Sequence, residues 1–401
     1  MPIDIEIADM IINRDIETKV KYMATKMPII AIIGPRQSGK TTFTKLAFPD
    51  YTYVTLEDPD NRSYATTDPR GFLLQYNKKV IFDEAQKAPE LFSYLQTYSD
   101  ENPIPGNYIL TGSQHFLLNE KISQSLAGRV AIFTLLPLSL KELHTKNEIK
   151  NLEEIIFTGF YPRIYASNLA PNDWYPGYIQ TYIERDVRQI TNILDLNLFQ
   201  KFLKLCAGRT GQLLNLSSLA NDCGITHNTA KSWIGLLEAS FIVFLLPPYH
   251  KNFGKRLIKS PKLYFHDTGI VCSLLNIENP AQLTTNYARG SLFENLIISE
   301  LIKNYYNQGR IPKLFFWRDQ IGHEIDCINE YQNTIEAIEL KSGKTIAQDF
   351  FVNLTYLQEI TDNFSTTSYV VYGGDNEQLR SKTKVISWRN IDKYLMQQED
   401  N

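Results

Sequence analysis

The first 150 residues contain several short, largely apolar stretches. Five consecutive apolar residues occupy positions 29–33, and further largely apolar stretches occur at 80–82, 108–110 and 130–135. Such runs are typical of parallel strands that are covered on both faces. A segment with helical spacing follows the first run. The pattern therefore predicts an α/β domain with a parallel sheet over residues 1–150.

Residues 196–265 show a different pattern, in which short helices precede two strands. The stretch 216–224 predicts a helix that ends at Gly224, and Thr226 is the expected N-cap of a second helix. Ala230, Trp233, Ile234 and Leu237 recur at helical spacing on one face. The apolar stretches 241–249 and 262–267 then predict two strands. This order predicts a winged helix-turn-helix.

The last third of the chain predicts a second α/β unit, over residues 266–401. An amphipathic helix is expected at 290–306, and strands are expected at 313–330, 334–343 and 366–374. A further helix is expected before the last of these strands.

Composition is that of a globular protein with two or three domains. The chain has 401 residues, of which 43% are hydrophobic and 21% charged. A net charge of -3 excludes nucleic-acid binding through bulk charge, so such binding needs a local basic patch. The cysteines are scattered and are expected to be reduced thiols; they are Cys206, Cys223, Cys272 and Cys327.

Two features of the sequence predict a cytoplasmic protein with no membrane partner. The first ten residues are acidic and lack the basic and apolar regions of a signal peptide. The apolar runs are also far shorter than the roughly 18 residues that a membrane span requires.

The strongest chemical signal is the phosphate-loop motif that follows the first predicted strand. It is a full G-x-x-x-x-G-K-[ST] match. Backbone amides of such a loop surround phosphate oxygens, Lys40 neutralises the β- and γ-phosphates, and the Thr41 hydroxyl ligates Mg²⁺. The expected ATP-binding residues of the loop are Gly34, Pro35, Arg36, Gln37, Ser38, Gly39, Lys40, Thr41 and Thr42.

Polar residues at the ends of later strands complete the predicted nucleotide site. Asp83 is expected to support Mg²⁺, and Glu84 to polarise the attacking water, which indicates hydrolysis as well as binding. Thr111, Ser113 and Gln114 either sense the γ-phosphate or cap the next element. Arg129 either contacts nucleotide phosphate, in its own subunit or in that of a homo-oligomer neighbour, or is an exposed arginine at a strand start.

A local basic patch lies between the two predicted strands of the winged helix. Residues 250–262 contain no acidic residue. This local charge is what phosphate contact requires, so DNA is a predicted partner, although the unit could equally serve as a spacer between domains. The expected DNA-contacting residues are Lys251, Lys255, Arg256 and Lys259, and Lys262 adds a fifth positive charge.

Acidic residues of the last unit form a candidate metal site. Strand alternation places Glu339 and Lys341 on one face, and a hairpin would bring Asp326 beside them. Carboxylates such as Asp326 and Glu339 are ligands for Mg²⁺ or Mn²⁺, and Lys341 would assist a nucleophile or a leaving oxygen. The same residues could equally be the polar edge of an ordinary hairpin, and Glu324 has no assigned role.

Motifs along nearly the whole chain resemble the prokaryotic AAA-type ATPases that are fused to a C-terminal domain of unknown function. The motifs are "GPRQSGKTT", "IFDEAQ", "LTGSQ", "LAGR" with "LLPLSLKE", "GFYPRIY" and "YIQTYIERDVRQI". The resemblance implies a phosphate-contacting arginine, for which Arg129 and Arg185 are candidates. Arg185 also fits a charged helix face. The resemblance further implies a helical lid or connector over 151–195.

The last unit resembles the PD-(D/E)xK nuclease superfamily, because a helix glutamate, a strand aspartate and a strand E-x-K occur in that order. The resemblance implies an α/β restriction-nuclease-like fold in which Glu294 completes the metal shell of Asp326 and Glu339. Two functions stay open. One is ATP-dependent DNA processing with metal-dependent phosphodiester cleavage. The other is an ATP-switched regulatory or binding protein whose last unit recognises a partner or DNA without cutting it.

Overall fold

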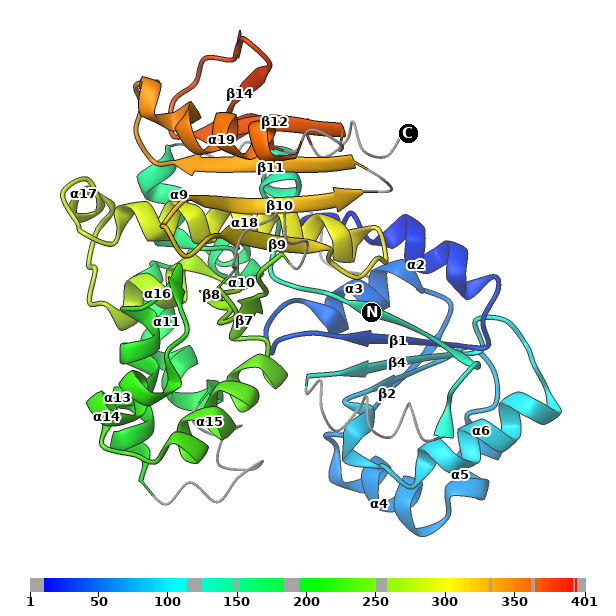
Figure 1. Cartoon of the computed structure of the whole chain (residues 1–401). Helices are drawn as coiled ribbons and strands as arrows, with labels where there is room; N and C mark the ends of the chain where they lie inside the picture. Colours follow the sequence, from blue (N-terminus) through cyan, green and yellow to red (C-terminus); the bar gives the residue numbers. More distant parts are fainter. Residues whose placement is uncertain are drawn as a thin grey trace.

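The computed structural model describes residues 11–113, 125–146, 151–183, 195–249, 258–331, 334–361, 365–391 and 394. Three sheets organise this part of the chain, and Figure 1 shows them with helices packed around and between them.

The N-terminal sheet is parallel and has the order β2-β3-β4-β1-β5. Its strands are β1 (Ile29–Ile33), β2 (Thr52–Thr55), β3 (Val80–Asp83), β4 (Tyr108–Gly112) and β5 (Val130–Thr134). The helices of this unit are α2 (Glu17–Ala24), α3 (Lys40–Ala47), α4 (Pro59–Thr67), α5 (Pro69–Gln75), α6 (Leu91–Glu101) and α8 (Leu140–His144).

Both faces of this sheet are covered, as the apolar runs predicted. Ile30 and Ile32 pack in one cluster with Phe43 of α3, whereas Ile29 and Ile33 belong to the core on the opposite face. The carboxyl ends of β1, β4 and β3 lie side by side, because β4 runs between the other two strands. The sheet therefore brings three strand ends to one edge.

The central unit contains helices and a small antiparallel sheet with the order β6-β8-β7. Its strands are β6 (Gln212–Leu213), β7 (Val243–Leu246) and β8 (Lys262–Phe265). Its helices are α9 (Leu152–Thr158), α10 (Pro162–Ala166), α11 (Pro171–Tyr178), α13 (Leu196–Ala207), α14 (Leu216–Cys223), α15 (His227–Ala239), α16 (Thr268–Leu274) and α17 (Pro280–Leu283).

The predicted helix boundaries in this unit are confirmed. Gly224 ends α14 in the left-handed region, with a φ of 83°. Thr226 caps α15, because the amide nitrogen of Thr229 donates to its hydroxyl oxygen over 3.1 Å. Trp233 and Leu237 are buried on the inner face of α15.

The C-terminal sheet is mixed and has the order β13-β14-β12-β11-β10-β9. β9, β10 and β11 are antiparallel, whereas β11, β12 and β14 are parallel. The elements are α18 (Arg289–Asn307), β9 (Leu314–Arg318), β10 (Glu324–Tyr331), β11 (Thr334–Lys341), α19 (Val352–Ile360), β12 (Ser365–Tyr372), β13 (Gln378–Arg380) and β14 (Thr383–Ser387).

Helix α18 joins the three units. In Figure 1 it runs beneath the C-terminal sheet and above the central unit, and it reaches towards the N-terminal sheet. Its side chains are buried on several sides, including the charged residues Glu300 and Lys303. One apolar core continues from Ile29 through Phe160 and Leu296 to Trp388. The described residues of the three units therefore pack as one body.

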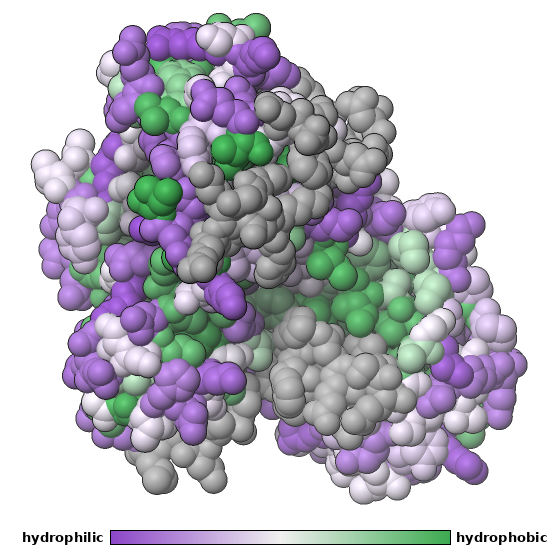
Figure 2. Space-filling model, viewed as in Figure 1, coloured by the Kyte–Doolittle hydropathy of each residue, from purple (hydrophilic) through white to green (hydrophobic). Residues whose placement is uncertain are grey.

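Apolar residues gather in the recess between the N-terminal unit and the rest of the chain, whereas the outer rims of the visible face are largely hydrophilic (Figure 2). Within the described ranges, we find no helix that combines the length and the apolar character needed to cross a membrane.

Candidate functional site

The phosphate loop begins where β1 ends, and two glycines shape it. A Cβ atom at Gly34 would lie 2.2 Å from the carbonyl oxygen of Leu135, so this position has no room for a side chain. Gly39 lies in the left-handed region with a φ of 91°. Lys40 Nζ donates to the carbonyl oxygens of Gly34 and Pro35 over 3.0 and 2.7 Å. The loop thus curls around its own lysine.

Asp83 links the ends of three strands to the loop. Its carboxylate accepts hydrogen bonds from the Thr41 hydroxyl over 3.0 Å and from the Tyr53 hydroxyl over 2.7 Å. Thr111 at the end of β4 also donates to it. Burial, and then the bond to Asp83, raises the pKa of Tyr53. The predicted pair of Mg²⁺-supporting residues, Thr41 and Asp83, is therefore in direct contact, and Tyr53 is a partner that the sequence did not indicate.

Glu84 and Ser113 face each other at the same sheet edge. The Ser113 hydroxyl donates to Glu84 Oε2 over 2.9 Å, and Gln86 donates to the same oxygen. Glu84 has a φ of 55°, and its amide nitrogen donates to the Thr111 hydroxyl oxygen over 3.1 Å. The strand end thus fixes the carboxylate beside the loop. Gln114 lies outside the described residues.

A cavity of about 1240 Å³ lies in front of the loop. Lys40, Thr41, Asp83 and Glu84 line it, together with Arg36, Gln37 and Thr42 of the motif. Ser38 Oγ is buried within the loop and has no hydrogen-bond partner among the described residues, as expected for a loop built to enclose an anion. Hydroxyl, carboxylate and ammonium groups together fit a Mg²⁺-nucleotide.

Two further segments contribute to this cavity. Ile11, Ile12 and Arg14 approach it from the N-terminal side, and Arg163 approaches it from α10. Arg163 is exposed, and its guanidinium makes no hydrogen bond or ion pair with the described residues. Arg163 belongs to the "GFYPRIY" stretch, whose resemblance to other ATPases was visible but did not reveal a role for this arginine.

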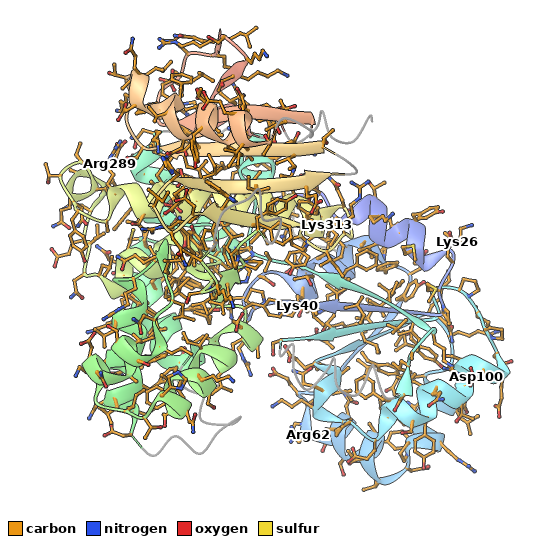
Figure 3. All side chains as sticks on the ribbon, in the orientation of Figure 1. Lys26, Lys40, Arg62, Asp100, Arg289 and Lys313 are labelled. Atoms are coloured by element: carbon orange, nitrogen blue, oxygen red, sulfur yellow. The ribbon has the colours of Figure 1, made fainter. Side chains whose placement is uncertain are left out.

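Arg129 lies at the opposite edge of the sheet. It precedes β5, and its carbonyl oxygen accepts from the amide of Ile29, the first residue of β1. Its guanidinium binds the Asp100 carboxylate, and Figure 3 places Asp100 far from Lys40. Because the phosphate loop follows the other end of β1, Arg129 is not brought to the nucleotide site of its own chain. A contact of Arg129 with the nucleotide of a neighbouring subunit stays a prediction. Arg185, the other candidate, lies outside the described residues.

The predicted hairpin of the last unit does bring Asp326, Glu339 and Lys341 together. Strands β10 and β11 pair with Cys327 opposite Ile338, which sets Asp326 beside Glu339. Lys341 Nζ lies 2.6 Å from Glu339 Oε2 and 3.9 Å from Asp326 Oδ2. Glu339 Oε1 is buried without a hydrogen-bond partner among the described residues. Two carboxylates and one ammonium group thus share one face of the sheet.

Glu294 has different partners from those expected. Lys262 Nζ lies 2.8 Å from Glu294 Oε1 and also binds Glu324, and the Tyr264 hydroxyl donates to Glu294 Oε1. Arg318 binds the second oxygen of Glu324. These contacts correct two expectations. Lys262 is buried and therefore does not belong to an exposed basic patch. Glu294 was expected to be a metal ligand, but its carboxylate binds the ammonium group of Lys262.

Two carboxyl groups of this cluster, those of Glu294 and Glu339, have a raised pKa. Burial, followed by the charge of Asp326, raises the pKa of Glu294 to about 7, although Lys262 opposes the shift. The same two causes raise the pKa of Glu339 well above its usual range. Burial lowers the pKa of Lys341, but the carboxylates of Asp326 and Glu339 outweigh this and raise it. Across the described residues, no group of three or more His, Cys, Asp or Glu side chains is arranged to hold a metal ion.

The predicted DNA-contacting residues are mostly beyond the part of the chain that the structure describes. This holds for Lys251, Lys255 and Arg256, whereas Lys259 is described and exposed. The first two turns of α15 expose a polar face that contains His227, Asn228 and Lys231.

The four cysteines are buried and unbridged.

Three family models match the chain. Residues 26–144 match an AAA domain, residues 149–281 match a domain of unknown function (DUF8612), and residues 289–391 match a domain of unknown function (DUF4143). The first match coincides with the parallel sheet and the phosphate loop. Residues 26–144 therefore form an AAA-type P-loop ATPase domain.

The relatives are bacterial proteins described as uncharacterized. Rv2008c of Mycobacterium tuberculosis is 29% identical over 343 residues, which cover 84% of this chain and 75% of the relative. A Haemophilus influenzae protein is 24% identical over 213 residues, which cover 50% of this chain and 52% of the relative.

Solved structures with partial likeness include a Walker-type ATPase of Pyrococcus abyssi and DnaA of Aquifex aeolicus bound to AMPPCP. The first has a TM-score of 0.44 at 13% identity, and the match covers 66% of this chain and 96% of that chain. The second has a TM-score of 0.29 at 13% identity, and the match covers 56% of this chain and 85% of that chain.

Proposed function

We propose that this protein binds ATP with Mg²⁺ and hydrolyses it at the edge of the N-terminal sheet. The contact between Thr41 and Asp83 carries the proposal, because it joins the phosphate loop to the strand end that bears Glu84. Thr41 and Asp83 would hold Mg²⁺, which would neutralise charge on the phosphates. Lys40 binds the β- and γ-phosphates, and Glu84 orients and polarises the attacking water.

Other residues of the cavity complete the proposed site. Ile11 and Ile12 offer an apolar surface for the nucleotide base, and Arg163 offers a guanidinium for phosphate oxygens. Ser113 holds Glu84 in place and lies where it can respond to the γ-phosphate. Within one chain, Arg163 is therefore the proposed phosphate-contacting arginine, a role for which the sequence had indicated Arg129.

Lys40→Ala and Thr41→Ala test this proposal in two separate ways. Lys40→Ala should abolish binding of ATP and hence hydrolysis, whereas Thr41→Ala should weaken the dependence of hydrolysis on Mg²⁺. Steady-state phosphate release and binding of a fluorescent ATP analogue measure both effects. Hydrolysis at the wild-type rate by Lys40→Ala would refute the assignment of the site.

We further propose that the central unit is a winged helix that contacts DNA. The order α13, β6, α14, α15, β7, β8 supports this reading, as does the antiparallel pairing of the three strands. The exposed polar face of α15 carries donors suited to phosphates and base edges, including Asn228 and Lys231. The basic residues of 251–259 add local positive charge.

Charge reversal tests DNA contact. Lys231→Glu combined with Lys259→Glu should weaken binding to duplex DNA and flatten its dependence on salt, because fewer counterions are released. Lys26→Glu, on the N-terminal unit (Figure 3), is the matched control with the same change in charge per residue. Unchanged DNA binding at low salt in the double variant would exclude this surface.

For the C-terminal unit, we propose a restriction-nuclease-like fold with a cation site at Asp326 and Glu339. The adjacent carboxylates and the unpartnered Glu339 Oε1 fit a hard cation such as Mg²⁺ or Mn²⁺, which would activate water for phosphodiester cleavage. Lys341 would support the nucleophile or the leaving oxygen. Glu294 is left out, because Lys262 and Tyr264 engage it.

A non-cleaving recognition unit is the second candidate, and the Lys262–Glu294 contact favours it. An ammonium group fixed among three carboxylates supplies positive charge without a metal ion. A plasmid-nicking assay with ATP and Mn²⁺ separates the two candidates. Cleavage that disappears in Asp326→Ala supports the nuclease, and intact plasmid together with DNA binding supports recognition alone.

A further inference from the structure

Arg14 is a buried arginine that precedes the ATPase domain and contacts the phosphate loop. Its Nη1 donates to the carbonyl oxygen of Ser38 over 2.8 Å, and its Nη2 donates to the carbonyl oxygen of Leu136 over 2.6 Å. Its Nε donates to Glu142 Oε1 over 3.0 Å. One guanidinium therefore ties the phosphate loop to the chain that follows β5.

The bond to Ser38 determines the direction of the next amide. A trans peptide is planar, so its carbonyl oxygen and the following N–H point in opposite directions. Because the Ser38 carbonyl points to Arg14 Nη1, the Gly39 N–H points away from the guanidinium. Backbone amides of a phosphate loop are the groups that bind phosphate oxygens.

Glu142 keeps the guanidinium of Arg14 in place. The carboxylate is almost fully buried, and its Oε1 also accepts from the amide of Asp15 over 2.9 Å. Its Oε2 accepts from the amide of Ser139 over 2.8 Å in the capping box of α8. Each oxygen of Glu142 is thus satisfied, and Arg14 has a fixed, charge-matched partner.

Helix α18 anchors the same segment from the other side. Glu300 Oε2 accepts from the amide of Leu140 over 2.7 Å, and Lys303 Nζ donates to the carbonyl oxygen of Leu138 over 2.8 Å. Glu300 and Lys303 are themselves paired over 2.6 Å and are buried. The segment that Arg14 grips is therefore held by a helix outside the ATPase domain.

We propose that Arg14 is a positioning residue for the ATPase reaction, which sets the Gly39 amide for phosphate through a segment anchored on α18. The inference rests on the proposed nucleotide site and adds a residue that lies outside the matched AAA domain. Arg14 acts through the loop backbone and not by contact with the reacting atoms.

Arg14→Ala and Arg14→Lys in the full chain test the proposal. Arg14→Ala should lower kcat/KM for ATP, and the affinity for an ATP analogue, by about tenfold or more, since a phosphate-facing amide loses its orientation. Added methylguanidinium should restore part of both. Arg14→Lys keeps the charge beside Glu142 but cannot reach three acceptors, so its values should be intermediate. Melting temperature is recorded for each variant.

Arg289→Ala is the matched control. Arg289 also joins distant segments, because it binds Glu153 and the carbonyl oxygen of Ser342, and Figure 3 places it far from Lys40. This variant should melt at a lower temperature and bind the ATP analogue as the wild type does.

Two outcomes would overturn the proposal. One is wild-type affinity and kcat/KM in Arg14→Lys. The other is an Arg14→Ala variant that loses melting temperature as Arg289→Ala does but binds the analogue normally. If the wild type binds ATP without hydrolysing it, the proposed hydrolysis is refuted. The affinities of the Arg14 variants for the ATP analogue still test the proposed role of Arg14 in that case.

Discussion

Lys262 Nζ lies 2.8 Å from Glu294 Oε1, which joins a strand of the central unit to the long helix of the C-terminal unit. Glu324 and Tyr264 complete this network. Glu324 thus has a partner, because its carboxylate binds the buried ammonium group of Lys262, and the charge of Asp326 also acts on that group. Burial lowers the pKa of Lys262, but the surrounding carboxylates outweigh this and raise it.

Lys262→Met should therefore destabilise the protein by about 3–5 kcal/mol, because it leaves buried carboxylates without their cation. Urea denaturation at neutral pH measures the loss. Lys259→Met is the control, and a change of less than about 0.5 kcal/mol is expected for this exposed residue. Equal stability of both variants would mean that the Lys262 network contributes nothing.

Glu294 makes a testable contribution to the pH dependence of stability. Its pKa is raised from 4.5 to about 7, so the folded protein holds this proton more tightly than the unfolded chain does. The resulting stabilisation is complete below the unfolded pKa and is lost as the pH rises towards 7. Its full size is about 3 kcal/mol.

Glu294→Gln should remove this part of the pH profile. Wild-type protein should lose more stability than the variant between about pH 5 and about pH 8. Denaturant midpoints across that range give the comparison. Parallel profiles for the two proteins would show that Glu294 titrates alike in the folded and unfolded states.

The two arginines near the ATPase sheet should differ sharply. Arg163→Ala should lower kcat/KM for ATP by about tenfold, because a phosphate-facing guanidinium is lost. Arg129→Ala should change it by less than about twofold in dilute protein, because Arg129 pairs with Asp100 at the far edge of the sheet. A large loss for Arg129→Ala that grows with protein concentration would instead place this residue in a neighbour's site.

The sequence was most informative where chemistry is local in the chain. The run Ile29–Ile33 and the loop that follows are contiguous, so strand, loop and helix could be predicted together. The hairpin of Asp326 and Glu339 was also predictable, because β10 and β11 are neighbours in the sequence and strand alternation sets their faces.

Long-range partners were not predictable. Arg14 and Glu142 are 128 positions apart, and no local pattern pairs them. Lys262 follows a run of basic residues of the kind that is usually solvated, yet it is buried by α18 and β10, which come later in the chain. Arg129 precedes its strand, and only the strand direction reveals that the phosphate loop is at the other edge.

The most direct test of the account is the separation of ATP binding from hydrolysis in Glu84→Gln. The substitution keeps an acceptor for Ser113 but removes the carboxylate that polarises water. We expect the variant to bind an ATP analogue with wild-type affinity while kcat falls by about 10²–10⁴-fold. Phosphate release at the wild-type rate would contradict the central claim that this sheet edge hydrolyses ATP.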